Sequence, residues 1–585
     1  MDTSVCQNCK QNFTIEPDDL SFYKKMQVPP PTFCSLCRMQ RRMAFRNERK
    51  LFKVKDAFTG ESLFSLYPPE AKRKIITQEE WHGDSWSAFD YGRDIDWSRP
   101  FIPQIFAIEK EVPIYNLCVK LMQNSPYSGN ATGLKNCYLC FNSSYSENSQ
   151  YGSAIDFCTD CVDNSQIHNC ERCYESFWLE KCYQCYFSIM CVDSRNMWFS
   201  RDCIGCNDCF GCTNLRKQSH CIFNEQFTKE DYEKKIAEMN LDSISGVVFA
   251  REKARAFWKT QINKYHQGLK NQNCTGSYVS NSKNVQDSWM VLESENMRFC
   301  QNMLIPGNKD CYDTNTWGEN TQLSYETIAT GENSYNMKFS YNCWPNCRDS
   351  EYCMNMFSSS NCFGCVGMTN AQFCILNKQY TKEQYEKLVP KIKEHMDAMP
   401  YIDKQKLQYT YGEFFPIEFS PFGYNNTMAQ EHVPLREDET RYLGYAWVGP
   451  ERGKHKATIF ANNLPDSIID VPNSILKEII ECVHCKLPYR IIPDELTFLR
   501  KEGLPLPRAC IDCRHGMRLD DRLPTPLYER TCMCAGESDE TNQYKNTVAH
   551  NHGASHCQNQ FKTGYDPETS SAIVYCEECY QQEVA

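Results

Sequence analysis

The chain has 585 residues, a net charge of about −11, an isoelectric point near 5.7 and 37 cysteines. This length allows several domains, and the acidic balance argues against a protein that binds nucleic acids over its whole surface. Residues 1–10 contain no apolar leader and no segment reaches the ~18 apolar residues of a membrane span, so we expect a cytoplasmic protein without a membrane partner. Thiols stay reduced in that compartment, so the cysteines indicate metal ligation, a buried core, or both.

Residues 1–55 contain two Cys-x2-Cys pairs, Cys6/Cys9 and Cys34/Cys37. Two such pairs predict a zinc ribbon, in which each pair grips one face of a tetrahedral ion and the metal replaces a core too small to fold alone. The intervening segment FTIEPDDLSFYKKMQVPPPTFC, followed by RMQRR, resembles the probable zinc-ribbon domain family. That resemblance implies a ribbon fold and a zinc site, and it implies no particular activity.

A run of basic residues follows the first ribbon, with Glu48 as its only acid. A ribbon with a basic stretch is one way to bind nucleic-acid phosphates; the other reading is a solvated helix face that balances an acidic body. The candidate nucleic-acid-binding residues are Arg38, Arg41, Arg42, Arg46, Arg49 and Lys50.

Residues 56–133 are rich in Trp and Pro. We expect Trp81, Trp86, Trp97 and Phe101 to pack a small adaptor or cap, because the open end of a repeat structure needs covering. An aromatic ligand-binding cluster is the alternative. Residues 56–80 contain no cysteine, so we infer no zinc site there.

Every third residue from Leu134 to Leu215 is small or apolar, apart from one Asn. A period of three fits neither an amphipathic helix nor a flat strand, and it predicts a narrow β-solenoid. Cys158, Cys170 and Cys182 are 12 residues apart, which indicates coils of 12 residues with four inward positions. This arithmetic resembles that of the insect β-helical antifreeze proteins, but their Thr-x-Thr rows are missing. Asn or Asp often precedes the inward residue, as expected at tight corners.

The solenoid is duplicated. Segments 209–236 and 362–389 begin with CFGC and match at an offset of 153, and residues 276–303 follow the same period of three. In each copy a Thr, Thr228 or Thr381, precedes a predicted helix with a capping-box spacing. The period slips near Pro306 and again after Cys343, which suggests bulged corners or short loops.

The inward cysteines allow three readings. They are compact hydrophobes, ligands of Cu(I) or another soft metal, or cross-core disulfides between residues six apart. The pairs with this spacing are Cys185/Cys191, Cys203/Cys209 and Cys206/Cys212. Val and Met occupy equivalent positions in the second copy, which favours the first reading.

The C-terminal part of the chain contains two further cysteine-rich modules. Cys482/Cys485 and Cys510/Cys513 repeat the spacing of the first ribbon. Cys532, Cys534, Cys576 and Cys579 then predict a third zinc site. A histidine cluster, His550, His552 and His556, lies near Cys557 in the sequence and completes that site, builds a second one with Cys557, or has a structural role. The candidate further ligands among these are His552, His556 and Cys557.

We therefore predict a mainly β fold, with two short-coil β-solenoids flanked by zinc ribbons and short capping helices. The predicted segments are a ribbon with a basic tail (1–55), an adaptor (56–133), solenoid and helix (134–240), a connector (241–275), solenoid and helix (276–398), a connector (399–475), a ribbon (476–523) and a Cys/His zinc module (524–585). The arrangement resembles uncharacterised proteins of small-genome bacteria that combine zinc ribbons with Asn- and Cys-rich repeats.

No Walker A loop, GxGxxG, HExxH or GxSxG motif is present, so we expect no enzyme activity. The expected function is a zinc-binding scaffold that holds about three Zn2+ and binds a protein partner. A nucleic-acid or ribosome-associated factor and a copper store in a thiol-lined solenoid are the alternatives.

Overall fold

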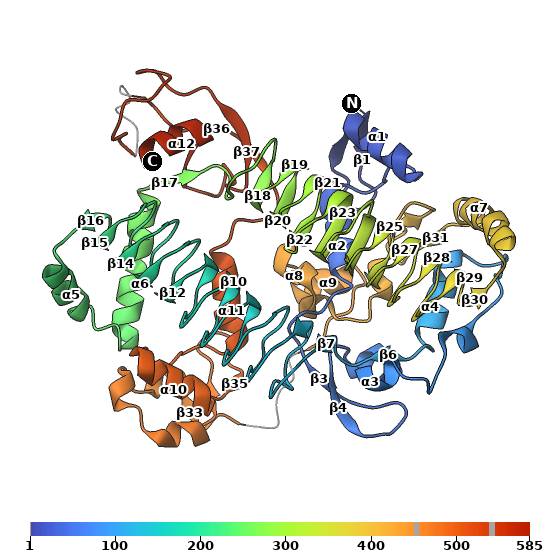
Figure 1. The fold of residues 1–585 in the computed structure, drawn as a ribbon, viewed down its shortest axis with the longest axis horizontal. Coiled ribbons are helices and arrows are strands. Elements are labelled where there is room, and N and C mark those ends of the chain that lie inside the picture. The colour runs from blue at the N-terminus through green and yellow to red at the C-terminus, as the bar shows by residue number, and fades with distance from the viewer. Residues whose placement is uncertain (1, 450–455, 537–543, 585) are drawn as a thin grey trace.

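A computed structural model describes residues 2–449, 456–536 and 544–584; residues 1, 450–455, 537–543 and 585 lie outside the described residues. The fold is mainly β, and stacked parallel strands form β-solenoids with coils of about the predicted 12 residues. Figure 1 shows the two solenoids side by side in the middle of the molecule, with the cysteine-rich modules around them. No helix in the described ranges is long and apolar enough to cross a membrane.

The first solenoid starts at β7 (Val119–Lys120), which pairs in parallel with β8 (Ala131–Thr132), so its first coil precedes the predicted residue 134. Its register repeats once per coil, and Cys185, Met197, Cys209 and Cys221 lie in line. The remaining strands are β9 (Ser153–Asp156), β10 (Ser165–His168), β11 (Phe177–Glu180), β12 (Tyr183–Tyr186), β13 (Arg195–Trp198), β14 (Asn207–Phe210), β15 (Ser219–Ile222) and β16 (Glu225–Gln226).

Each inward residue of this solenoid follows a corner residue, most of which have left-handed backbone. Asn136, Asn169 and Asp202 have φ of 53°, 52° and 54°, and larger residues such as Trp178 share this conformation. A non-glycine residue in this region costs about 1–3 kcal/mol. Hydrogen bonds between coils offset that cost; for example, Asn136 N–H donates to Gln123 O at 2.9 Å.

The inward thiols and hydroxyls bond the backbone across the narrow interior. The Cys137 thiol donates to Ser146 O at 3.3 Å, and the Cys182 thiol donates to Cys191 O at the same distance. Ser146 Oγ accepts the Cys158 N–H at 3.1 Å. All 37 cysteines are free thiols. Cys and Ser therefore fill a small space and also provide partners for backbone groups that would otherwise be buried unpaired.

The second solenoid has coils of unequal length. Met297 pairs with Cys311, Tyr312 with Tyr325 and Ser360 with Gln372, so these three coils contain 14, 13 and 12 residues. The longer coils account for the slips in the sequence period. Its strands are β18 (Gly276–Ser280), β19 (Lys283–Gln286), β20 (Ser288–Leu292), β21 (Glu295–Arg298), β22 (Gln301–Met303), β23 (Lys309–Gly318), β24 (Tyr325–Gly331), β25 (Tyr335–Lys338), β26 (Tyr341–Cys343), β27 (Arg348–Glu351), β28 (Ser360–Phe363), β29 (Gln372–Ile375) and β30 (Lys378–Gln379).

Both solenoids are followed by the predicted capped helices, α5 (Lys229–Ala237) and α7 (Lys382–Ala398). Thr228 Oγ1 accepts the Asp231 N–H at 3.1 Å, and Thr381 forms a complete capping box with Gln384. These hydrogen bonds satisfy backbone donors that a helix start leaves without an intrahelical partner.

A second pair of helices covers the ends of the solenoids. Helix α6 (Ile244–Lys259) covers the first, where the Trp258 indole donates to Gly211 O at 3.2 Å. Helix α4 (Phe101–Glu109) covers the second, and a Cβ on Gly364 would lie 2.9 Å from the Phe101 ring. Gly211 and Gly364 follow the same Cys-Phe pair in the two CFGC segments, so the two helices occupy equivalent places. Helix α4 covers the second solenoid but precedes the first in sequence, and α6 covers the first solenoid but precedes the second. Each solenoid is therefore covered by the helix that precedes the other one.

Most of the predicted adaptor aromatics pack against the second solenoid. Trp81 and Phe101 are buried, and Trp86 is partly buried beside Ala88, which joins the thiol-rich core of the second solenoid. Trp97 remains 44% exposed, against expectation, and makes an edge contact with His395. The adaptor therefore caps the second solenoid, although the chain passes from it directly into the first.

Each solenoid also receives a helix from the terminal ribbon that is distant in sequence. Helix α2 (Ser35–Met43) packs on β23 and β24, and Arg38 Nη2 lies 2.8 Å from a carboxylate oxygen of Asp313. Helix α11 (Ile511–Asp520) lies on the first solenoid, and Arg514 Nη1 is 2.9 Å from Asp163. Counted in coils from the solenoid end, Asp163 and Asp313 occupy the same position, five coils before the last. We call these two contacts the arginine clamps.

The clamps are buried ionic contacts. Arg38, Asp313, Arg514 and Asp163 are each no more than 1% exposed. Burial raises the pKa of Asp163 to about 6 against the opposing effect of Arg514 and Arg518. Forming such a contact costs free energy because both charges lose their hydration. Removing one partner destabilises the fold more, because the other charge stays buried and unpaired.

We predict that Asp163→Asn lowers the free energy of unfolding by about 3–5 kcal/mol, because Arg518 loses its buried carboxylate partner and Arg514 keeps only Glu495, at 2.9 Å. Asn keeps the side-chain shape and tolerates the φ of 56° at this position. Denaturant unfolding measures the loss. Asp160→Asn is the matched control, since Asp160 shares the coil and the left-handed backbone but pairs at 3.5 Å with the exposed Lys501. Equal effects of the two substitutions contradict the clamp.

Candidate metal centres

The N-terminal ribbon (ribbon 1, residues 2–43) gathers its four cysteines at one point. Strands β1 (Asp2–Val5) and β2 (Asn12–Ile15) form a hairpin, and Cys6 N–H donates across its turn to Gln11 O at 2.9 Å. Helix α1 (Pro17–Met26) follows, and Cys34 is the N-cap of α2. The ligand atoms of Cys6, Cys9, Cys34 and Cys37 all lie within 4.8 Å of one another.

The spacing of these sulfurs suits a tetrahedral zinc ion. Zn–S bonds of ~2.3 Å in a tetrahedron place sulfurs about 3.8 Å apart. Cys9 Sγ and Cys34 Sγ are 3.7 Å apart. The predicted ligands of ribbon 1 are therefore brought together with a geometry that fits Zn2+.

The ribbon at residues 480–520 (ribbon 3) repeats this geometry. It consists of β34 (Ile480–Glu481), β35 (Pro488–Tyr489), α10 (Pro493–Glu502) and α11, with Cys510 as the N-cap of α11. Cys482, Cys485, Cys510 and Cys513 meet within 4.8 Å, and the Cys485 and Cys510 sulfurs are 3.6 Å apart.

Local contacts favour the thiolate form of one cysteine in each ribbon, Cys6 and Cys482. Burial and the neighbouring thiols raise the pKa of Cys34, Cys37, Cys510 and Cys513. The Asn8 amide donates to Cys37 Sγ, and Cys510 N–H donates to Cys482 Sγ, both at 3.3 Å. Burial raises the pKa of Cys482, but the backbone N–H groups of Cys510 and Cys485 outweigh it and lower the pKa to about 7. Contacts with the Cys34 and Cys37 thiols hold the pKa of Cys6 far below its ordinary value. Deprotonated thiols bind Zn2+ without first releasing a proton.

A ribbon without cysteine lies in residues 52–81 (ribbon 2), which the sequence predicted partly as the basic tail of the first ribbon (to residue 55) and partly as the adaptor (from residue 56). Strands β3 (Phe52–Lys55) and β4 (Ser62–Ser65) form its hairpin, and β5 (Ile75–Ile76) leads to α3 (Gln78–Trp81). Ala57 N–H donates to Ile75 O at 2.8 Å, as Gln7 N–H donates to Thr32 O in ribbon 1. These correspondences place Asp56, Thr59, Thr77 and Glu80 at the four ligand positions.

Hydrogen bonds join those four positions in ribbon 2. The Asp56 carboxylate accepts the N–H groups of Phe58, Thr59 and Thr77 at 2.8–3.1 Å, and Thr77 Oγ1 accepts the Glu80 N–H at 3.2 Å. Burial raises the pKa of Asp56, but the backbone donors outweigh it and hold the pKa below its ordinary value. The sequence contains one signal for ribbon 2, which is the interval between consecutive ribbons. Asp56 follows Cys37, the last ligand of ribbon 1, at the same interval as Cys532 follows Cys513.

The C-terminal module (ribbon 4, residues 528–536 and 544–584) has two groups of ligands. Strands β36 (Tyr528–Thr531) and β37 (Gln560–Thr563) form its hairpin, and β38 (Ile573–Tyr575) leads to α12 (Glu577–Val584). One group consists of Cys532, Cys557, Cys576 and Cys579, and the other of Cys534, His550, His552 and Cys579. Within each group the ligand atoms lie within 4.8 Å of one another.

This grouping changes the predicted third site. Cys557 takes the place expected for Cys534, which instead meets two histidines. His552 joins the second group, whereas His556 bonds the carbonyl of its neighbour Cys557 and is exposed. His550 belonged to the predicted histidine cluster but was not named as an individual candidate ligand, although its His-x-His spacing with His552 is visible in the sequence.

The basic residues between Arg38 and Lys50 are not arranged for binding phosphates, which corrects that expectation. Arg38, Arg41 and Arg42 are at most 2% exposed and hold the protein's own carboxylates. Arg41 lies 2.8 Å from Glu326 and 2.9 Å from Glu413. A buried guanidinium has no surface to offer a nucleic acid.

The other three basic residues are only partly exposed. Arg46 pairs with Glu48 at 2.9 Å, and Lys50 pairs with Asp512 of ribbon 3 at 2.5 Å. Burial lowers the pKa of Arg49. They lie where ribbons 1 and 3 approach each other and do not form a free basic face.

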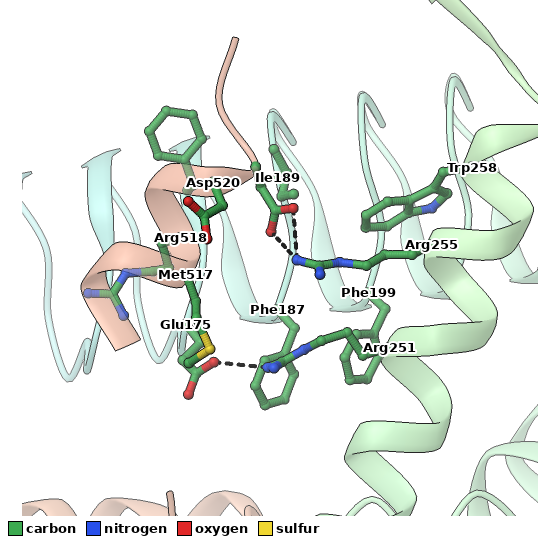
Figure 2. A pocket seen from close by; sticks show the side chains of 12 residues that line it. Glu175, Phe187, Ile189, Phe199, Arg251, Arg255, Trp258, Met517, Arg518 and Asp520 are labelled. Atoms are coloured by element: carbon green, nitrogen blue, oxygen red, sulfur yellow. Dashed lines mark hydrogen bonds and ion pairs between the residues drawn. The ribbon is translucent and has the colours of Figure 1, made fainter. Parts of the chain in front are cut away.

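Ion pairs border a partly open cavity of about 210 Å³ on the first solenoid, shown in Figure 2. It lies where α6, α11 and the solenoid meet. Arg251 pairs with Glu175 at 3.0 Å (Figure 2), and Arg255 donates to Asp521 at 2.8 Å. Its aromatic walls include Phe187, Phe199 and Trp258 (Figure 2). These ion pairs add contacts of α6 with the first solenoid and with Asp521 to the Arg514 clamp of α11.

No family model matches this chain, and no curated protein matches it. A crystal structure of a proposed acetyltransferase from Desulfovibrio desulfuricans G20 aligns at 12% identity over 40% of this chain and 62% of that one, with a TM-score of 0.11. At this TM-score the alignment carries no argument about fold or function.

We predict that ribbon 2 gains a zinc site when all four ligand positions become cysteine. The combined variant Asp56→Cys, Thr59→Cys, Thr77→Cys and Glu80→Cys is expected to bind one more Zn2+ per chain than the parent, because its knuckle and helix start are placed as in ribbon 1. Native mass spectrometry counts the ions, and Asp56→Cys alone is the control that adds none. A folded four-cysteine variant with the parent's ion count refutes the equivalence.

Proposed function

We propose that this protein is a zinc-binding, non-enzymatic scaffold. One observation carries the proposal: each of the four ligand groups offers four protein ligands. Structural zinc sites are closed in this way, whereas catalytic zinc sites keep a position open for water or substrate. An ion held by any of these groups would have no open position.

The ligand types support zinc in particular. Ribbons 1 and 3 offer four thiols each, and ribbon 4 adds two imidazoles. Tetrahedral sets of thiolate and imidazole suit Zn2+, while Mg2+ and Ca2+ prefer oxygen ligands.

In this proposal the ions act through the helices that they order. Cys34 and Cys37 lie at the start of α2, and Cys510 and Cys513 lie at the start of α11. The same helices carry Arg38 and Arg514 of the clamps. A zinc ion in ribbon 1 or ribbon 3 would therefore fix the position of the start of this helix. About one helical turn later, the same helix carries the arginine that contacts the solenoid.

The solenoids would supply the binding surface of the scaffold. Side-chain amides of Asn124, Asn136 and Asn148 form a ladder with hydrogen bonds of 3.1 Å. Tyr145 and Phe157 stack on consecutive coils at 5.3 Å between ring centroids, and both are more than half exposed. Exposed aromatic side chains in a regular row favour a protein partner.

Cobalt substitution tests whether the sites are closed. We expect Co2+ in place of zinc to give the absorption of tetrahedral cobalt thiolates, and we expect added azide or cyanide to leave that spectrum unchanged, because no coordination position is open.

Cys9→Ala provides the positive control for this experiment, because removing the exposed Cys9 ligand opens one position in ribbon 1. That variant is expected to respond to the anion. An anion-dependent spectrum in the unmodified protein would point to an open, catalytic type of site and would overturn the scaffold proposal.

A further inference from the structure

We propose that ribbon 4 holds two metal ions that share the Cys579 thiolate as a bridging ligand. Cys532, Cys557 and Cys576 complete the first set of four, and Cys534, His550 and His552 complete the second. The proposal rests on zinc binding by the ribbons, and it raises the expected number of ions from three to four.

The first of these sets corresponds to the ribbon site of ribbons 1 and 3. Cys532 N–H donates to Asn559 O at 2.8 Å, as Cys6 N–H donates to Gln11 O in ribbon 1. Each acceptor follows its second knuckle cysteine by two residues, so Cys557 is the counterpart of Cys9. The Cys557 and Cys576 sulfurs are 3.9 Å apart, close to the tetrahedral value of about 3.8 Å.

The second set comes from an insertion into the knuckle of ribbon 4. Ribbon 1 has two residues between its first two cysteines, whereas ribbon 4 has a long segment between Cys532 and Cys557. The insertion contains Cys534, His550 and His552. His550 Nδ1 lies 3.1 Å from Cys534 Sγ, and His552 Nε2 lies 3.3 Å from the same sulfur.

Neighbouring groups orient this second set for a cation. The other nitrogen of His550, Nε2, lies 2.9 Å from the Glu583 carboxylate, and the side chains of both residues are fully buried. A carboxylate that accepts the far N–H of an imidazole fixes the near nitrogen as a metal-binding lone pair. The Asn546 amide donates to Cys534 Sγ at 3.2 Å, which favours the thiolate. Both contacts are what a metal ligand requires of its surroundings.

The number of ligands requires a bridge. Seven side chains converge, and a tetrahedral ion takes four of them. Two complete sets are possible only if one ligand serves both ions, and Cys579 is the residue that belongs to both groups. A thiolate has lone pairs for two ions, and its negative charge between two dications offsets their repulsion. The second ion displaces the proton of the Cys534 thiol to solvent, and no electron is transferred.

The two-ion cluster would stabilise contacts of ribbon 4 with the first solenoid and with the segment that leads into the second. Strand β38 pairs in parallel with β17 (Ile262–Lys264), which leads into the second solenoid. The Tyr580 hydroxyl, next to Cys579 in sequence, donates to Asn214 Oδ1 of the first solenoid at 2.9 Å. Two ions at this point would fix both contacts at once.

Native mass spectrometry of reduced protein loaded with zinc counts the ions. We expect four per chain, three in His552→Ala and four in His556→Ala, the matched control whose side chain lies outside both groups. The double variant Cys34→Ser/Cys37→Ser, which removes two of the four ligands, is expected to lose the ion of ribbon 1 alone. Three ions with no further loss in His552→Ala overturn the bridge, whereas no loss in Cys34→Ser/Cys37→Ser overturns the zinc proposal itself.

Cadmium-113 NMR of the cadmium-loaded protein tests the bridge independently of counting. We expect two of the four resonances to be coupled to each other through the shared sulfur, and we expect His552→Ala to abolish that coupling. Four resonances without any cadmium–cadmium coupling would mean two separate sites and would refute the shared Cys579.

Discussion

Two buried arginines connect the helices of the ribbons to the two solenoids. Arg38 reaches Asp313 on the second solenoid, and Arg514 reaches the equivalent Asp163 on the first. Both side chains would be hydrated in an unfolded chain, so each contact is favourable only when its helix is held in place against the solenoid. The helices α2 and α11 start at the metal-binding cysteines of their ribbons. The placement of the solenoids thus depends on small modules at the two distant ends of the chain.

The narrow interior of the solenoids explains why such support is needed. Inward positions hold mainly Cys, Ser and other small residues, which bury little apolar area compared with Leu or Phe. The larger hydrophobic clusters lie outside the coils, where aromatic side chains of the solenoids pack against ribbons and covering helices. Tyr174 and Phe498 of ribbon 3 make one such contact. The solenoids are therefore stabilised from outside as much as from within.

The solenoids and the cysteine pairs were predictable from the sequence, because a period of three and Cys-x2-Cys spacing are local patterns. The partners of Arg38 and Arg41 were not, since their carboxylates lie in a distant part of the chain and look like ordinary surface acids in the sequence. Ribbon 2 was missed because Asp56 replaces a thiolate by hydrogen bonds, which leaves no cysteine to detect. The pairing of Cys532 with Cys557 was missed because the insertion separates two knuckle residues that normally lie close together in sequence.

Amide hydrogen exchange with and without metal tests most directly whether the ribbons hold the solenoids. The account predicts that chelation under reducing conditions speeds exchange in α2 and α11 and also in the coils around Asp313 and Asp163, because loss of the clamps leaves their carboxylates unpaired. Coils far from the clamps, such as the one that contains β7, stay protected. Faster exchange confined to the ribbons, with the coils around Asp163 and Asp313 unchanged, would contradict the account.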